Sequence, residues 1–88
     1  MIRRNFSFLP PGGILIDVRE REEYETFHLP GSLCIPVYQI AEELSRILPD
    51  RTTPVFLYCD HGIKSRSAAI RLMDMGYQNV FDVGGIGK

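Results

Sequence analysis

Two runs of apolar, β-forming residues dominate the hydrophobic pattern, and each is followed by a change to polar residues. Ile14–Val18 and Val55–Tyr58 have the near-continuous hydrophobicity of strands that are covered on both faces. Two weaker apolar segments, Leu33–Pro36 and Val80–Val83, predict shorter strands. The pattern therefore predicts a sheet in which Ile14–Val18 is a central parallel strand.

The segments between these strands predict helices. Val37–Leu48 has apolar residues at helical spacing, and Ser65–Met75 combines helix formers with apolar residues, among which Met73 and Met75 are expected to be packing residues. The charged helix formers at positions 19–25 predict a short helical turn that is mostly solvated. Gly76 predicts the end of the last helix.

Strands that alternate with helices at short intervals are typical of a parallel α/β sheet with right-handed crossovers. The 88 residues suffice for one small domain, so we expect a single domain over 1–88. Within it, we expect a short N-terminal segment at 1–12, with a brief first strand, and a loop-like C-terminal tail at 84–88.

Composition and charge exclude several classes of protein. Hydrophobic residues make up 44% of the chain and charged residues 24%, which argues against disorder. The net charge of −1 gives no basic surplus, so nucleic acid is not an expected partner. No stretch resembles a membrane span or a signal peptide, so we expect no membrane partner and a cytoplasmic location. The cysteines Cys34 and Cys59 are too few and too far apart to suggest disulfides or zinc, so we expect no metal.

Candidate chemistry gathers where two predicted strands end, because the carboxyl ends of parallel strands share one edge of the sheet. Asp17 and Arg19 follow one strand, and Cys59 follows the other. Through a short loop, Cys59 also precedes a helix N-terminus, where unpaired N–H groups and the helix dipole favour a thiolate. Gly62 permits a tight turn that points the backbone N–H groups of 60–65 inward. The pattern predicts a nucleophilic cysteine in an anion-binding loop.

Other residues of the loop fit this interpretation. Lys64 adds a positive charge, and Ser65 can cap the helix and donate a hydroxyl hydrogen bond. His61 is badly placed to serve as the base of a Cys/His acyl-transfer pair, because it lies on the same tight turn. The sequence leaves open whether His61 tunes the thiolate or is simply exposed to solvent.

Three sequence blocks, taken together, resemble the rhodanese (sulfurtransferase) domain family over nearly the whole chain, from Ile14 to Ile86. The first block joins Asp17-Val18-Arg19-Glu20, Glu23-Tyr24 and His28-Leu29-Pro30-Gly31-Ser32; the second joins Cys59-x-x-Gly62-x-Lys64-Ser65, Ala68-Ala69, Leu72 and Gly76-Tyr77; the third is Val83-Gly84-Gly85-Ile86. Each block alone is a weak signal, but three blocks in the right order and spacing are specific.

The resemblance implies a rhodanese-like fold, in which a central parallel sheet is flanked by helices on both faces. It also implies a sulfurtransferase that needs no cofactor. Cys59 would take sulfane sulfur from a small donor such as thiosulfate, hold it as a persulfide, and pass it to cyanide, a thiol or a protein acceptor. The resemblance implies a substrate-binding loop of Asp60, His61, Gly62, Ile63, Lys64 and Ser65, and a supporting network of Asp17, Arg19, Glu23 and His28.

The loop length bears on an alternative function. Cell-cycle phosphatases and arsenate reductases, which resemble this family, use a longer Cys-x5-Arg loop around an oxyanion. Here Ser65 occupies that arginine position and Arg66 comes one residue later, so a Cys-based phosphatase or arsenate reductase is less favoured. A persulfide carrier without turnover, or a regulatory rhodanese-like binding module, stays an open alternative. The physiological donor and acceptor and the oligomeric state are open as well.

Two residues of the Cys59 loop depart from the family pattern. Lys64 occupies a position where arginine is common, which keeps the charge and loses the bidentate fork. Asp60 is expected to disfavour a dianionic donor such as thiosulfate, because it places a carboxylate beside the sulfur.

Cys34 is interpreted as a packing residue, with a resolving thiol as the alternative. Arg66 and Arg71 are expected to be solvated unless they form a docking surface for an acidic partner. The early end of the chain predicts that one face of the sheet is thinly covered.

Overall fold

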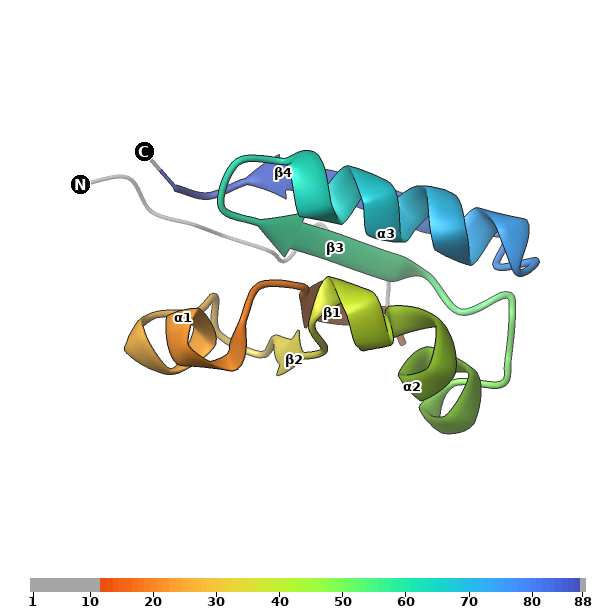
Figure 1. Ribbon diagram of the computed structural model, residues 1–88. Helices are drawn as coiled ribbons and strands as arrows, with labels where there is room; N and C mark the ends of the chain where they lie inside the picture. Colours follow the sequence, from red (N-terminus) through yellow and green to blue (C-terminus); the bar gives the residue numbers. More distant parts are fainter. Residues whose placement is uncertain (1–11, 88) are drawn as a thin grey trace.

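The sheet has four parallel strands in the order β2-β1-β3-β4 (Figure 1). The computed structural model describes residues 12–87, so the strand predicted near the N-terminus lies outside the described residues. The strands are β1 (Ile14–Asp17), β2 (Leu33–Cys34), β3 (Val55–Cys59) and β4 (Val80–Gly85). The predicted α/β class and the central position of the first apolar run are both confirmed.

Two helices cover one face of the sheet. They are α2 (Ile40–Ile47), which a single 3-10 turn at Val37–Gln39 precedes, and α3 (Ile63–Asp74). Buried side chains from both helices, from β1 and β3 and from the segments beside them form the larger core: Ile16, Val18, Ile35, Ile40, Leu44, Val55, Leu57, Cys59, Ala68, Ala69, Leu72 and Tyr77. Alanines 68 and 69 let α3 lie close to the sheet.

The connection from β1 to β2 passes over the opposite face, as a right-handed crossover requires. It includes the short helix α1 (Arg21–Thr26), of which no residue is buried. Leu29, farther along this connection, packs with Leu15, Phe56 and Tyr58 in a smaller core. On the same sheet, the Phe81 ring stacks on Phe56 with centroids 4.9 Å apart and is 46% exposed.

The predicted boundaries are close to those observed, with three corrections. The last helix begins at Ile63, two residues before the predicted start at Ser65. Met73 is 52% exposed, so the packing prediction was wrong for this residue, whereas Met75 packs against the larger core as predicted. Gly84 and Gly85 are part of β4 and pair with Tyr58 and Cys59, so they are not loop-like tail residues. Hydrogen bonding to a buried neighbouring strand outweighs the weak strand propensity of glycine there. Among residues 12–87, no helix has the length and apolar character needed to cross a membrane.

Candidate active site

Cys59 lies at the carboxyl end of β3, where the chain turns into α3. Every residue of β3 is buried, and the Cys59 side chain is only 2% exposed. The turn depends on Gly62, whose φ of 88° lies in the left-handed region that other residues adopt only with strain. The sequence-predicted strand–loop–helix junction is thus present at the predicted place.

The backbone of this turn points hydrogen-bond donors at the sulfur. The N–H of Gly62 donates to Cys59 Sγ at 3.0 Å, and the N–H of Ser65 donates to it at 3.3 Å. The Cys59 thiol donates to the Ser65 hydroxyl oxygen at 3.4 Å, and that hydroxyl donates to the Gly62 carbonyl. The two backbone N–H groups, together with the N-terminus of α3, stabilise negative charge on a sulfur atom held at this point.

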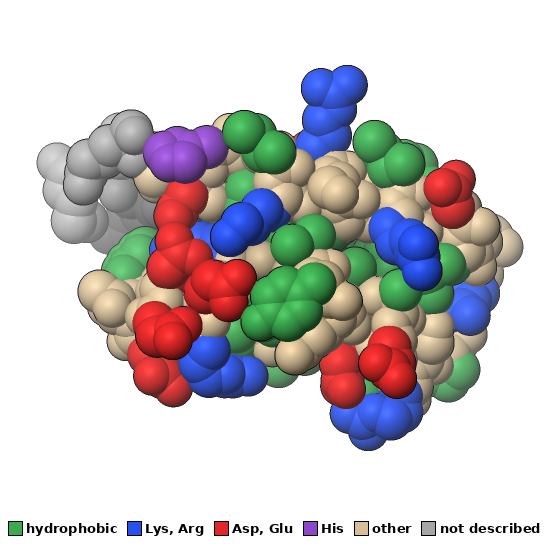
Figure 2. Space-filling model, viewed as in Figure 1, with side chains coloured by type: hydrophobic (Ala, Val, Ile, Leu, Met, Phe, Trp, Pro, Cys, Tyr) green, Lys and Arg blue, Asp and Glu red, His purple; other side chains and the backbone are tan. Residues whose placement is uncertain are grey.

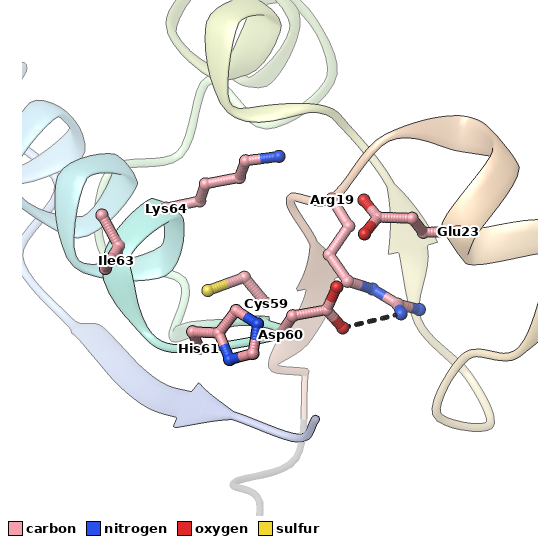
Figure 3. A pocket seen from close by; sticks show the side chains of 7 residues that line it. All are labelled: Arg19, Glu23, Cys59, Asp60, His61, Ile63 and Lys64. Atoms are coloured by element: carbon pink, nitrogen blue, oxygen red, sulfur yellow. Dashed lines mark hydrogen bonds and ion pairs between the residues drawn. The ribbon is translucent and has the colours of Figure 1, made fainter. Parts of the chain in front are cut away.

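A pocket with a volume of about 310 Å³ opens above the sulfur. Figure 3 shows the side chains around it, with the Asp60 carboxylate turned toward Arg19. The pocket is lined by Arg19, Glu23, Cys59, Asp60, His61, Ile63 and Lys64. Arg19, which follows β1, and Cys59, which ends β3, therefore meet at one edge of the sheet, as the sequence predicted.

Arg19 is held by two carboxylates from different segments. Its Nε and Nη2 donate to Asp17 Oδ1 and Oδ2 at 3.0 and 2.8 Å, and its Nη1 donates to Asp60 Oδ1 at 3.1 Å. Nη2 also donates to the carbonyl of Phe27. These bonds raise the pKa of Arg19, chiefly through Asp17. The guanidinium is therefore occupied with protein acceptors, and Arg19 ties the end of β1 to the loop after Cys59.

Asp60 is a charged residue of the pocket wall. Its interaction with the Glu23 side chain, followed by the hydrogen bond with Arg19, holds the pKa of the Asp60 carboxyl below its usual range. The carboxylate that the sequence placed beside the sulfur is thus ionised, and Arg19 offsets part of its charge.

Glu23 and His28 have different positions with respect to the pocket. Glu23 lines it, and its Oε1 accepts from the N–H of Glu20 at 2.9 Å as part of the capping box of α1. His28 stacks on Tyr24 with ring centroids 3.8 Å apart, and its Nδ1 is 2.8 Å from the Tyr24 carbonyl. Arg19 and Glu23 thus line the pocket, Asp17 is buried and holds Arg19 there, and His28 packs on Tyr24 of α1 without lining the pocket.

Other site residues were not singled out by the sequence. Tyr58, fully buried next to Cys59, accepts from the Leu29 N–H at 3.0 Å and shares a hydrogen bond of 3.0 Å with the Ser32 hydroxyl. The N–H groups of Ile86 and Gly87 donate to the carbonyls of Cys59 and Asp60 at 2.8 and 2.9 Å. The Val83–Ile86 block of the sequence pointed to the contact between the end of β4 and the Cys59 loop. No local sequence pattern pointed to the role of Tyr58.

Cys34 lies in the edge strand β2, in register with Asp17, and is partly buried. Burial is the main cause that raises the pKa of the Cys34 thiol, which disfavours the reactive thiolate form. This environment fits the packing interpretation, and a resolving role stays a prediction.

The sequence and the fold of this chain match those of known proteins. The model of the rhodanese-like domain family matches residues 7–87, so this chain belongs to that family. It is 37% identical to thiosulfate sulfurtransferase PspE of Escherichia coli over 71 residues, which cover 81% of this chain and 68% of that protein. It is 39% identical to the adenylyltransferase and sulfurtransferase UBA4 of Candida albicans, but spans only 19% of that much longer protein.

A solved structure agrees with these matches. A rhodanese with anions from E. coli superimposes with a TM-score of 0.80 at 35% sequence identity, over 84% of this chain and 87% of that one. The predicted family and fold are therefore confirmed.

Proposed function

We propose that this protein is a sulfurtransferase that carries sulfane sulfur on Cys59 as a persulfide. The observation that carries the proposal is the convergence of the Gly62 and Ser65 N–H groups on the Cys59 sulfur at the base of a pocket. Fixed backbone dipoles of this kind stabilise an anionic thiolate or persulfide without reorganisation. The names of both curated relatives described above include sulfurtransferase, which supports the same reaction class.

The reaction divides into two balanced displacements. The Cys59 thiolate attacks the sulfane sulfur of thiosulfate, the S–S bond of the donor breaks, and sulfite leaves with the electron pair. The acceptor, cyanide or a thiolate, then attacks the outer sulfur of the persulfide. The bond between the two sulfurs breaks, its electron pair returns to Cys59 Sγ, and thiocyanate or a new persulfide departs.

The pocket suggests how a donor is held. Lys64 is the cation of the pocket wall that no carboxylate of residues 12–87 pairs with, whereas Arg19 is engaged by Asp17 and Asp60. An anionic donor would therefore meet the ammonium of Lys64, with Asp60 opposing it. This balance favours donors of low charge over a dianion.

A phosphatase or arsenate reductase is less well supported. An oxyanion of that size needs an arginine fork directed into the loop. Arg66, the nearest arginine in sequence, is exposed and lines a neighbouring groove on α3 but not the Cys59 pocket.

Intact-mass analysis tests the proposal. Wild-type protein incubated with thiosulfate is expected to gain one sulfur atom, and a cyanide chase is expected to remove it. Cys59→Ser should gain none, while the matched control Cys34→Ser should behave like the wild type.

The other outcomes separate the alternatives. Gain without release to cyanide would favour a carrier or regulatory module over an enzyme. A protein that gains no sulfur from thiosulfate or from a low-molecular-weight persulfide would refute the proposal, and hydrolysis of an aryl phosphate would favour the phosphatase.

A further inference from the structure

A groove outside the Cys59 pocket runs along the exposed side of α3. We name it the α3 groove, and its lining residues are His61, Gly62, Ile63, Arg66, Ser67 and Ile70. It is shallow, with a volume of about 460 Å³. His61 and Ile63 line both the groove and the Cys59 pocket, so the two are continuous.

Two aliphatic side chains of the groove are largely exposed to solvent. Ile63 is 77% exposed and Ile70 is 49% exposed, although both lie on a helix whose other face is buried. They are seven positions apart and therefore lie on the same side of α3. Exposed aliphatic residues grouped beside a reactive site mark a surface that another molecule covers.

Arg66 is the cationic side chain of the groove lining, whereas Lys64 lines the Cys59 pocket and Arg71 lines a separate groove beside α2. Lys64, Arg66 and Arg71 lie on α3 with Asp74 as its one acidic residue, and none of the three cations is in an ion pair within the part of the chain that is described. In Figure 2, blue side chains are interspersed with green ones over α3, whereas most red side chains on the left gather over α1. The two sides of the pocket thus differ in sign of charge, although the net charge of the chain is only −1.

We propose that the α3 groove docks an acidic segment of a partner protein that carries the acceptor thiol. The proposal rests on the persulfide function of Cys59 and adds the class of acceptor. A carboxylate of the segment would meet Arg66, and an aliphatic side chain would cover Ile63 and Ile70. Neither cyanide nor thiosulfate is large enough to use this surface.

Helix geometry sets the spacing within such a segment. Residues 63 to 70 span about 10 Å of α3, at 1.5 Å per residue. An extended peptide covers about the same length in three residues. The acidic and aliphatic residues of the partner are therefore expected within about four positions of its cysteine. The acceptor thiolate would form a bond to the outer sulfur of the persulfide, whose bond to Cys59 Sγ breaks as the electron pair returns to Sγ.

Two synthetic peptides test this acceptor class. Each contains one cysteine and one leucine, and they differ in having three glutamates or three glutamines within four positions of the cysteine. Protein already carrying the persulfide is mixed with each peptide, and sulfur transfer is followed by intact mass. The acidic peptide is expected to react about tenfold faster at low salt, and this preference should fall strongly in about 0.5 M salt, where charges are screened.

Substitutions in the groove test whether the preference for the acidic peptide depends on this surface. Arg66→Glu is expected to abolish or reverse it, and Arg66→Gln to reduce it. Ile70→Asp is expected to slow transfer to the acidic peptide at least about fivefold. Arg46→Glu makes the same change of charge on α2 at an exposed arginine outside the groove, and should keep the full preference. All variants should load sulfur from thiosulfate and release it to cyanide at the wild-type rate, which also shows that they are folded.

The failures of the two proposals differ. If wild-type protein never forms the persulfide, the proposed function fails. If the persulfide forms and is released to cyanide, but the peptides react equally or Arg66→Glu and Arg46→Glu behave alike, the docking proposal is overturned and the function stands. A change in oligomeric state with Ile70→Asp, without any peptide preference, would assign the groove to a second copy of the chain and would also overturn it.

Discussion

The guanidinium of Arg19 connects two loops of the site by donating from Nη1 to Asp60 Oδ1 at 3.1 Å. Asp17 binds the other side of the same guanidinium, so the single positive charge of Arg19 is shared between two carboxylates. The loop residue next to Cys59 is thus held by an ion pair that is only partly exposed, with the Asp60 side chain 33% accessible. This pairing fixes the position of the Asp60 charge at the pocket wall.

Replacing Asp60 by asparagine is expected to improve the use of thiosulfate. Asparagine keeps an oxygen that accepts from Arg19 but removes the negative charge that opposes a dianion. We expect kcat/KM for thiosulfate to rise about threefold to tenfold, a size typical of a single charge near a partly exposed site. Steady-state kinetics at low salt measure the effect. Glu42→Gln, which makes the same charge change at an exposed position on α2, should leave it unchanged.

Lys64 is expected to act in donor binding. Lys64→Gln removes the positive charge of the pocket wall that faces an anionic donor, so KM for thiosulfate should rise about fivefold to tenfold with little change in kcat. Lys64→Arg should retain binding. The matched control is Arg71→Gln, farther along α3 and outside the Cys59 pocket. An unchanged KM in Lys64→Gln would contradict the role of this ammonium.

The partners of Asp60 show where sequence reasoning reached its limit. Hydrophobic runs predicted β1 and β3 and therefore the shared edge on which Asp17, Arg19 and Cys59 lie. The charge beside the sulfur was also predicted. Its pairing with Arg19 was not, because the two residues are 41 positions apart and only the observed register brings them together.

The glycines of β4 were missed for a related reason. Gly84 and Gly85 have low strand propensity, so local pattern favours a loop. In the folded chain they hydrogen-bond along β3, and the following residue, Ile86, packs in the smaller core. Hydrogen bonds to the buried strand β3, which is distant in sequence, stabilise a strand that the local residue types do not favour.

Tyr58→Phe is expected to destabilise the fold. The Tyr58 hydroxyl accepts from the Leu29 N–H and bonds to Ser32, so its loss leaves a buried donor without a partner. Such a loss costs about 1–3 kcal/mol. Urea unfolding should show a lower midpoint with an unchanged slope. Tyr38→Phe, at an exposed tyrosine, is the control and should keep the wild-type midpoint.

The same tyrosine predicts a loss of stability in alkali. Burial raises the pKa of Tyr58 to about 12 in the folded protein, against about 10 for an unfolded tyrosine. The folded state therefore holds its proton at a higher pH, so this contribution is complete below about pH 10 and is lost as pH rises toward 12. Unfolding free energies measured between these limits should fall less steeply for Tyr58→Phe. Equal slopes for the two proteins would contradict the assignment.

Gly85→Ala is expected to damage the Cys59 loop from the neighbouring strand. A Cβ at Gly85 would lie 2.4 Å from the carbonyl oxygen of Asp60 and 2.8 Å from His61 Cα, so backbone must shift. Because these atoms directly precede Gly62, the shift would disturb the N–H groups that hold the sulfur. We expect persulfide formation to slow at least about tenfold, with a stability loss of about 1–3 kcal/mol.

Gly84→Ala separates this loop effect from backbone strain. At Gly84 a Cβ meets no atom within 4 Å, but the φ of 98° is strained for alanine. That variant should lose about 1 kcal/mol of stability and keep its rate of persulfide formation, since nothing is pushed against the loop. Intact-mass time courses and urea unfolding of both variants make the comparison. Equal losses of rate in the two would mean that strain in β4, and not contact with Asp60, limits the site.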